Sequence, residues 1–527
     1  MGCKTGCKKI KDMNFERWSD GRIKNNDVNH PIMKELLDDK GPGFCLAKWT
    51  QVTMHLGNGL THSCHHPGVH KIPLEELEKN PSALHNTEYK KERRKEMLNG
   101  KRPTECDYCW RIEDHQNNFS DRVYKSIDGF SIDDHDKIKE MTGDEDVFPR
   151  YVEVSFGNVC NFKCAYCGPN FSSKWAEEIK QQGPYKLEDM LFNGGDDVEV
   201  HYRNREDNPY TDAFWKWFPV ASKEMHTFRI TGGEPLLSKH TFKVLDYLIA
   251  NPNPNLEFAV NSNAGVPRKV WEKFTKKVAK LEQANCIKKF TLFASAEATG
   301  KQCEFIRVGM NWDEFTSNIK YFLDNTTNTR LTFMSAFNLL SAPTLQSFFK
   351  YVLTLKKTYC SGSLQDWVDN ETDIDLTKVK SLGNPDMLHR PDNKEFQRVA
   401  IDVPYVREPS FLDARILTKE LIEDYLIDAL DFMIQNCAYD GWNNSIFFNR
   451  LEIERFKRIV IDLMIHVRYN DSWEDRQNRR RFYKWTLENE KRNGMNFSQI
   501  FPEMKNFYDI CKTEYDTHIE AVTNGVQ

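Results

Sequence analysis

Residues 160–167 read Cys-Asn-Phe-Lys-Cys-Ala-Tyr-Cys, a Cys-x3-Cys-x2-Cys run that comes just after a β-rich stretch. The chain has 14 cysteines among 527 residues, so this spacing is expected by chance only about 0.01 times in a chain of this length. Three clustered thiolates are soft ligands that suit iron–sulfur clusters or zinc. A 4Fe-4S cluster takes four ligands, so three local cysteines leave one iron open to a ligand from outside the protein.

From residue 151 onward, β-rich and helical stretches alternate. The helical stretches, 242–250 and 270–281, carry apolar residues at three- and four-residue spacing, which is typical of amphipathic helices on a sheet. This alternation predicts an α/β fold with a parallel sheet, which right-handed crossovers curl toward a barrel. The β-rich runs are residues 151–156, 227–230, 256–260, 290–294 and 331–337.

A second short segment, Thr231-Gly232-Gly233-Glu234-Pro235, follows the β-rich run that ends at residue 230. It is therefore expected at the carboxyl end of a strand, where ligands of barrel folds bind. Glycine has no side chain, so the backbone there can approach a ligand closely.

Together, the cysteine run and the Gly-Gly-Glu-Pro segment resemble the radical S-adenosylmethionine (radical SAM) superfamily, in which an aromatic residue such as Tyr166 precedes the last cysteine. The resemblance implies a partial (β/α)6 TIM-like barrel and a 4Fe-4S cluster held by Cys160, Cys164 and Cys167. It also implies that S-adenosylmethionine chelates the open iron and is cleaved by one electron to a 5′-deoxyadenosyl radical, which abstracts hydrogen from a substrate.

The same resemblance implies further contacts to S-adenosylmethionine. Gly232, Gly233, Glu234 and Pro235 correspond to the element that holds the methionine amino group. Asn261, Ser295 and Arg307 correspond to turn, serine and arginine positions that relatives use for the cofactor's ribose and carboxylate, and a guanidinium suits a carboxylate because it donates two parallel hydrogen bonds. Glu297 lies near the same strand end as a candidate catalytic residue, with a salt bridge or a turn role as equal alternatives.

Four more cysteines, Cys45, Cys64, Cys106 and Cys109, lie upstream. From residue types alone, four thiolates that include a Cys-x2-Cys pair suit a structural zinc ion. The segments also resemble the twitch and SPASM modules of radical SAM enzymes, which implies an auxiliary 4Fe-4S cluster instead of zinc. Most twitch modules follow the barrel, whereas this one precedes it, as in some relatives encoded by phages and marine bacteria.

These features divide the chain into a polar segment (1–40), the twitch/SPASM-like module (41–118), a linker rich in acids and glycine (119–150), the barrel (151–395) and a helical extension (396–527). Residues 184–222 form an insertion within the barrel. The stretch 421–437 and the stretch 451–467 are the clearest helices of the extension.

Charge and hydropathy limit the partners. Lys and Arg total 73 against 78 for Asp and Glu, a net charge of −5, so a nucleic-acid partner is not favoured and would need a local patch such as residues 479–484. No apolar stretch is long enough for a membrane span, and 14 cysteines without a secretory signal indicate a reducing, cytoplasmic compartment.

We expect an oxygen-sensitive enzyme with a one-electron reductant of the flavodoxin or ferredoxin type, acting on a ribosomally made peptide or protein, or on a small molecule. The alternatives are a non-catalytic iron–sulfur or zinc scaffold and a radical enzyme that modifies nucleic acid.

Overall fold

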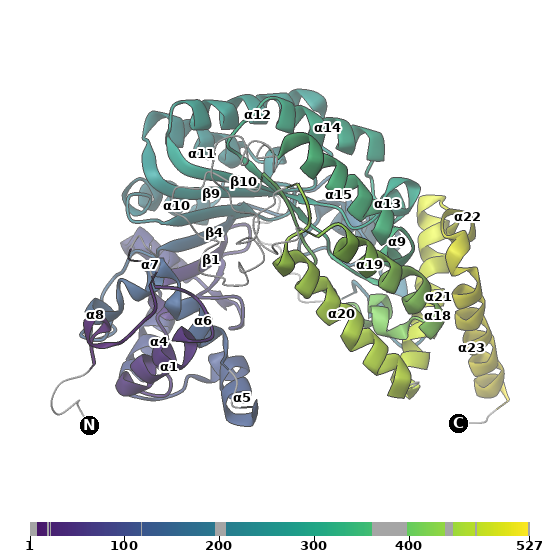
Figure 1. The fold of residues 1–527 in the computed structure, drawn as a ribbon, viewed down its shortest axis with the longest axis horizontal. Helices are drawn as coiled ribbons and strands as arrows, with labels where there is room; N and C mark the ends of the chain where they lie inside the picture. Colours follow the sequence, from purple (N-terminus) through teal and green to yellow (C-terminus); the bar gives the residue numbers. More distant parts are fainter. Residues whose placement is uncertain are drawn as a thin grey trace, which may run out of the picture.

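A computed structural model describes residues 8–17, 21, 23–116, 119–194, 207–360, 398–437, 446–469 and 472–524. Its centre is a nine-stranded sheet with the order β13-β12-β10-β9-β8-β4-β1-β2-β3 (Figure 1). The pairings between neighbouring strands from β13 to β1 in this order are all parallel, and the pairings of β1 with β2 and of β2 with β3 are antiparallel. The predicted α/β class with a mostly parallel sheet is therefore confirmed. Six of the parallel strands are β4 (Tyr151–Ser155), β8 (Thr227–Thr231), β9 (Asn253–Ser262), β10 (Ile287–Ser295), β12 (Arg330–Met334) and β13 (Val399–Asp402).

The two faces of this sheet differ in polarity. Val152, Val154, Phe228 and Ile230 are fully buried on one face, because successive side chains of a strand point to opposite sides. The alternate residues of the same strands are polar and half-buried, and with their counterparts on β9 and β10 they form what we call the polar face: Tyr151, Glu153, Arg229, Thr231, Asn261, Phe293 and Ser295.

Amphipathic helices cover the apolar face. They are α11 (Lys239–Ala250), α12 (Arg268–Gln283), α14 (Trp312–Asp324) and α15 (Leu345–Tyr359), and the first three lie along one side of the sheet in Figure 1. In α12 the buried residues include Trp271, Phe274, Val278 and Leu281, at the spacing that puts them on one side of a helix. The Trp271 indole N–H also donates to the backbone carbonyl of Asn318 in α14 at 2.7 Å. A hydrogen bond therefore joins α12 to α14 in addition to apolar packing.

The N-terminal region extends the same sheet. Strand β1 (Gln51–His55) runs parallel to β4 from Gln51 beside Tyr151 to His55 beside Ser155, and β2 (Leu60–His62) and β3 (His70–Lys71) follow it at the edge. Around these strands, α1 (Asn29–Lys40), α5 (Asp107–Gln116) and α6 (Asp121–Ile127) enclose a second hydrophobic cluster, separate from that of the main sheet.

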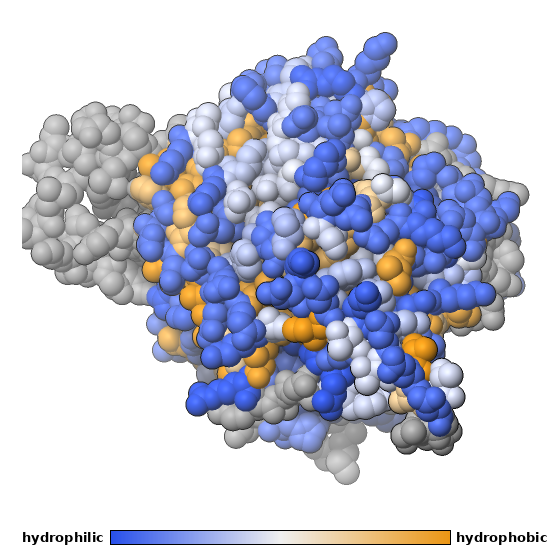
Figure 2. Space-filling model, turned by 90° about the vertical axis from the view of Figure 1, so that its right-hand side faces the viewer, coloured by the Kyte–Doolittle hydropathy of each residue, from blue (hydrophilic) through white to orange (hydrophobic). Residues whose placement is uncertain are grey.

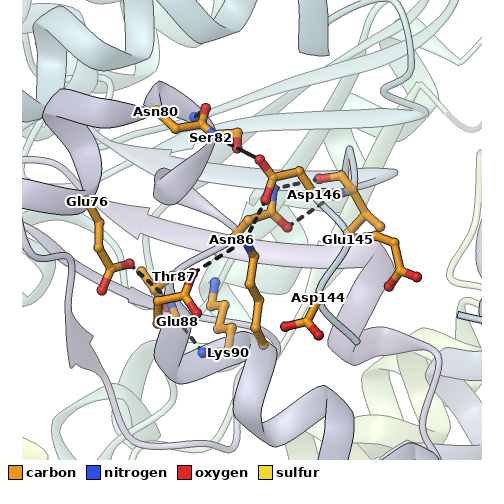
Figure 3. Close-up of polar contacts among 12 residues, drawn as sticks. Glu76, Asn80, Ser82, Asn86, Thr87, Glu88, Lys90, Asp144, Glu145 and Asp146 are labelled. Carbon is orange, nitrogen blue, oxygen red and sulfur yellow. Dashed lines mark hydrogen bonds and ion pairs between the residues drawn. The ribbon is translucent and has the colours of Figure 1, made fainter. Parts of the chain in front are cut away.

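Residues 119–150, which the sequence analysis assigns to a linker, are packed against this region. They contain α6, α7 (Gly129–Ile132) and α8 (His135–Ile138). The acidic stretch that follows is tied to α4 (Glu88–Leu98) and the turn before it. Asp146 accepts hydrogen bonds from Ser82 and Asn80, the Ser82 bond at 2.6 Å (Figure 3). It also forms an ion pair with Lys91 at 2.9 Å.

The described part of the C-terminal region is mainly helical, with α19 (Asp428–Gln435), α20 (Arg450–Tyr469), α21 (Trp473–Asn493) and α23 (Lys505–Thr523). The strand β13 precedes these helices and was not among the expected β-rich runs. The side of the molecule that carries α23 is mainly hydrophilic, with hydrophobic residues in scattered groups (Figure 2). Within the described residues, no helix is both long and apolar enough to cross a bilayer.

A buried ion pair joins α20 to α15 and β13. The Lys356 Nζ lies 3.0 Å from both carboxylate oxygens of Glu452, and the same carboxylate accepts the backbone N–H of Ile401 in β13.

We expect Glu452→Ala to destabilise the protein by about 3–5 kcal/mol, because it leaves the Lys356 charge buried without a partner. Denaturant midpoints would measure the loss. Glu177→Ala, which breaks a half-exposed pair with Lys174, is the control and should cost less than about 1 kcal/mol; equal effects would contradict the expectation.

Candidate functional site

The three cysteines of the 160–167 run lie in one loop at the carboxyl end of β4. Within it, β5 (Lys163–Cys164) pairs with β11 (Arg307–Val308), and Cys164 lies directly opposite Arg307. The cysteines line a cavity of about 170 Å³. Twelve further described residues line it. Most of the predicted cofactor contacts are among them, namely Tyr166, Gly232, Gly233, Asn261, Ser295 and Arg307, and the others are Phe162, Phe171, Ser172, Thr231, Ser262 and Asn263.

Gly232 and Gly233 let two backbones meet. Gly232 has φ +126°, and a Cβ on Gly233 would lie 2.4 Å from the Val159 carbonyl oxygen. The backbone N–H of Gly233 donates to Gly157 at 3.2 Å, and that of Glu234 donates to Val159 at 2.7 Å. Close packing against the cysteine loop therefore requires glycine at both positions. The absence of side chains there also leaves open space beside the cavity.

Glu234 lies behind the cavity wall and is buried. Its carboxylate accepts hydrogen bonds from the Ser262 hydroxyl at 2.9 Å and from the backbone N–H groups of Asn263 and Leu236 at 2.7 and 3.0 Å. Burial raises the pKa of Glu234 to about 7, and these hydrogen bonds oppose the rise. The side chain joins the ends of β8 and β9, and neither Glu234 nor Pro235 lines the cavity. The cofactor contact that the family resemblance implies for these two residues stays a prediction.

Arg307 and Glu297 form a buried ion pair beside the cysteines. The guanidinium donates two N–H bonds to one Glu297 oxygen at 2.9 and 2.6 Å, and a third N–H lies 3.6 Å from the Cys164 sulfur. The Tyr166 hydroxyl donates to the other Glu297 oxygen at 3.3 Å. Burial lowers the pKa of Arg307, but the charges of Glu297, Tyr166 and Cys164 and of other neighbours together outweigh burial and raise the pKa well above its usual value. The salt-bridge alternative for Glu297 is therefore the one that the geometry supports.

The pairing of Arg307 with Glu297 was not expected from the sequence. A signal for it was present, since an acid and an arginine ten residues apart flank a helix, α13 (Gly300–Ile306), that returns the chain to the cysteine loop. Ser295, at the end of β10, and Asn261, near the end of β9, line the cavity from the sheet.

The four upstream cysteines converge on a second, small cavity of about 20 Å³. Cys45, Cys64, Cys106 and Cys109 all line it, and they come from three separate segments of the N-terminal region, since Cys106 and Cys109 are only three residues apart. Arg122 and Lys125 line it as well, and burial raises the pKa of each thiol. Cationic neighbours favour thiolates. As the side chains stand, no three or more His, Cys, Asp or Glu residues in the described ranges are grouped closely enough to hold one metal ion.

His65 and His66, which follow Cys64, contact aromatic and acidic side chains. His66 lines the small cavity, stacks on Tyr108 with ring centres 3.9 Å apart, and lies 2.7 Å from the Asp121 carboxylate. His65 meets Tyr151 of the polar face edge to face.

The basic stretch in α21 is engaged with carboxylates. Arg480 contacts Glu188 at 2.8 Å, Arg481 contacts Asp189 at 2.6 Å, and Arg479 contacts Glu514 at 2.9 Å. These pairs neutralise the three charges that nucleic-acid binding would need. Glu188 and Asp189 belong to the expected insertion 184–222, of which residues 195–206 lie outside the described residues; its aromatic part forms α10 (Pro209–Ala221), whose Phe214, Trp217 and Phe218 are core residues.

Residues 154–338 match the family model described as the Radical SAM superfamily, which confirms the resemblance over the range that contains the 170 Å³ cavity. The crystal structure of Streptococcus suis SuiB bound to precursor peptide SuiA matches with 14% identity and a TM-score of 0.27, over 67% of this chain and 72% of that chain. An overlap this weak assigns neither fold nor substrate. No curated protein sequence matches the chain.

Gly233→Ala tests the close packing behind the cavity. The added Cβ would meet backbone atoms of residues 158 and 159, so we expect a destabilisation of about 1–3 kcal/mol and a loss of iron retention by the cysteine loop after reconstitution. Gly68→Ala is the matched control, because nothing lies within 4 Å of its Cβ position and its φ is ordinary. Normal iron retention in Gly233→Ala would show that the loop does not depend on this contact.

Proposed function

We propose that this enzyme, whose residues 154–338 form a radical SAM domain, holds a 4Fe-4S cluster on Cys160, Cys164 and Cys167 and binds S-adenosylmethionine in the adjoining cavity. The observation that carries the proposal is that three thiols of one loop line this cavity together with Asn261, Ser295 and other polar groups at strand ends. When bound, the cluster and S-adenosylmethionine supply a 5′-deoxyadenosyl radical for hydrogen abstraction.

The chain's own residues would prepare the site in three ways. Arg307 would keep a positive charge beside Cys164 and favour its thiolate, since their nearest atoms are 3.6 Å apart. Glu234 and the glycines would hold the cysteine loop against the ends of β8 and β9. Asn261 and Ser295 would offer hydrogen bonds to the polar groups of S-adenosylmethionine, as their places on the cavity wall support.

For the N-terminal region we propose an auxiliary 4Fe-4S cluster on Cys45, Cys64, Cys106 and Cys109. Four thiols from three segments line one cavity, two of them buried and two partly buried, with Arg122 and Lys125 beside them. This arrangement supports a thiolate-bound metal centre. A zinc ion is the alternative that the 20 Å³ volume favours, because a single ion needs less room than a cubane.

For the substrate we propose a ribosomally made peptide or protein. The polar face is half-exposed across neighbouring strands, which suits an extended polar chain better than a compact apolar molecule. The chemistry needs one electron per cleavage, so we also propose a flavodoxin- or ferredoxin-type reductant and an oxygen-poor, intracellular setting.

Iron and sulfide counting after anaerobic reconstitution, with an assay for 5′-deoxyadenosine under dithionite, tests the proposal. We expect about eight irons per chain, as two cubanes require. Cys164→Ala should lose about half of the iron and all of the 5′-deoxyadenosine. Cys106→Ala should lose the other half.

The core cysteine Cys286 is the matched control, because it is buried away from both cavities; Cys286→Ala should keep about eight irons and full cleavage. About four irons with cleavage, together with bound zinc that Cys106→Ala removes, would assign the upstream cysteines to zinc. Zinc alone without cleavage would overturn the enzyme proposal in favour of a metal-binding scaffold.

A further inference from the structure

Arg229 is an arginine of the polar face that lies next to the S-adenosylmethionine cavity. It is two residues before Thr231, which lines the cavity, and its side chain is 21% exposed while Phe228 and Ile230 on either side are fully buried. Its Nε–H donates to the Asn261 amide oxygen at 2.8 Å, and Asn261 also lines the cavity. The guanidinium carbon lies 4.3 Å from the centre of the Phe293 ring, so the group is fixed in place from two sides.

Within the described residues, the guanidinium of Arg229 makes only a long ion pair with a carboxylate and no hydrogen bond to one. Its nearest acid is Glu153, at 3.9 Å from Nε, which is too long for a hydrogen bond. The Glu153 carboxylate instead accepts hydrogen bonds from the hydroxyls of Tyr151 at 3.1 Å and Thr231 at 3.3 Å. Tyr151 is also a hydrogen-bonding neighbour of the guanidinium. Among the described residues, these contacts engage only part of its five N–H groups.

Arg307 differs from Arg229 in this respect. Arg307 is 5% exposed and donates two bonds to a fully buried Glu297, so its fork is already occupied. Arg307 lines the cavity, and Arg229 contacts Asn261, which also lines it. Of the two arginines, Arg229 is the one that combines a fixed guanidinium with unengaged donors on a half-exposed face. A planar fork of this kind matches a carboxylate, with which it forms two parallel hydrogen bonds.

We propose that Arg229 binds a carboxylate of the substrate, supplied by an acidic side chain of a peptide, and so holds the substrate beside the cavity where hydrogen abstraction takes place. Asn261 and Phe293 are positioning residues for this guanidinium. The inference rests on the proposed function, because it takes the 170 Å³ cavity as the S-adenosylmethionine site.

Calorimetric titration of the reconstituted full chain with S-adenosylmethionine bound tests the inference. The probes are two capped peptides, Ala-Ala-Glu-Ala-Ala and Ala-Ala-Gln-Ala-Ala, and free glutarate. We expect the Glu peptide to bind about tenfold or more tightly than the Gln peptide, as charge-assisted bonds imply. Arg229→Gln should abolish the difference, and Arg229→Lys should keep part of it. Arg268→Gln, on an exposed helix face, is the matched control and should leave the difference unchanged.

Each outcome has one meaning for the carboxylate site. Tighter binding of the Glu peptide without glutarate binding supports a peptide source, and binding of both that Arg229→Gln removes supports carboxylate recognition with a small acid as a further ligand. Equal affinity of the two peptides, or discrimination that survives Arg229→Gln, would overturn the inference. Binding is read without turnover, so a wild-type protein that shows the discrimination but forms no 5′-deoxyadenosine would contradict the proposed function and not this site.

Discussion

Backbone packing without side chains is the constraint on which the candidate site depends. Gly232 and Gly233 bring the end of β8 against residues 157–159 at distances that a Cβ would not allow. From there one series of hydrogen bonds runs through Glu234 to the end of β9, and Asn263 continues it to Asn161 at 2.8 Å in the cysteine loop. The positions of the three thiols thus follow from contacts between strand ends. The end of β8 contacts one part of the cysteine loop, and the residues after β9 contact another.

Burial decides how the charged groups near the cavity can act. Arg307 is buried, so its positive charge is paired with the Glu297 carboxylate inside the fold, and this pair has a structural role. On the polar face water reaches the side chains, and a less tightly matched charge such as that of Arg229 is tolerated at low cost. A structural ion pair between β11 and the loop after β10 therefore borders the cavity, while open donors lie next to it on the polar face of the main sheet.

Local patterns account for what the sequence predicted well. The Cys-x3-Cys-x2-Cys run, the Gly-Gly-Glu-Pro segment and the period of α12 each lie within a few residues, and their places at strand ends and on a helix agree with the structure. The features of the fold that were not predicted from the sequence depend on contacts between residues far apart in the chain. Strand β13 pairs with β12 from 68 positions along the chain, β1 joins β4 from 100 positions before it, and Arg480 meets Glu188 across 292 positions. No short-range pattern encodes such pairings, because tertiary contacts select them.

The parallel pairing of β1 with β4 has a consequence for electron transfer. Cys64 follows β2, the hairpin partner of β1, and Cys160 follows β4. One cysteine of each set therefore follows a strand of the same hydrogen-bonded sheet, with β1 between the two strands. A hinge between them would have to break that ladder. The fold would therefore fix the distance that an electron crosses between the two sets of cysteines. The rate of transfer would depend on the reduction potentials of the two centres and not on domain motion.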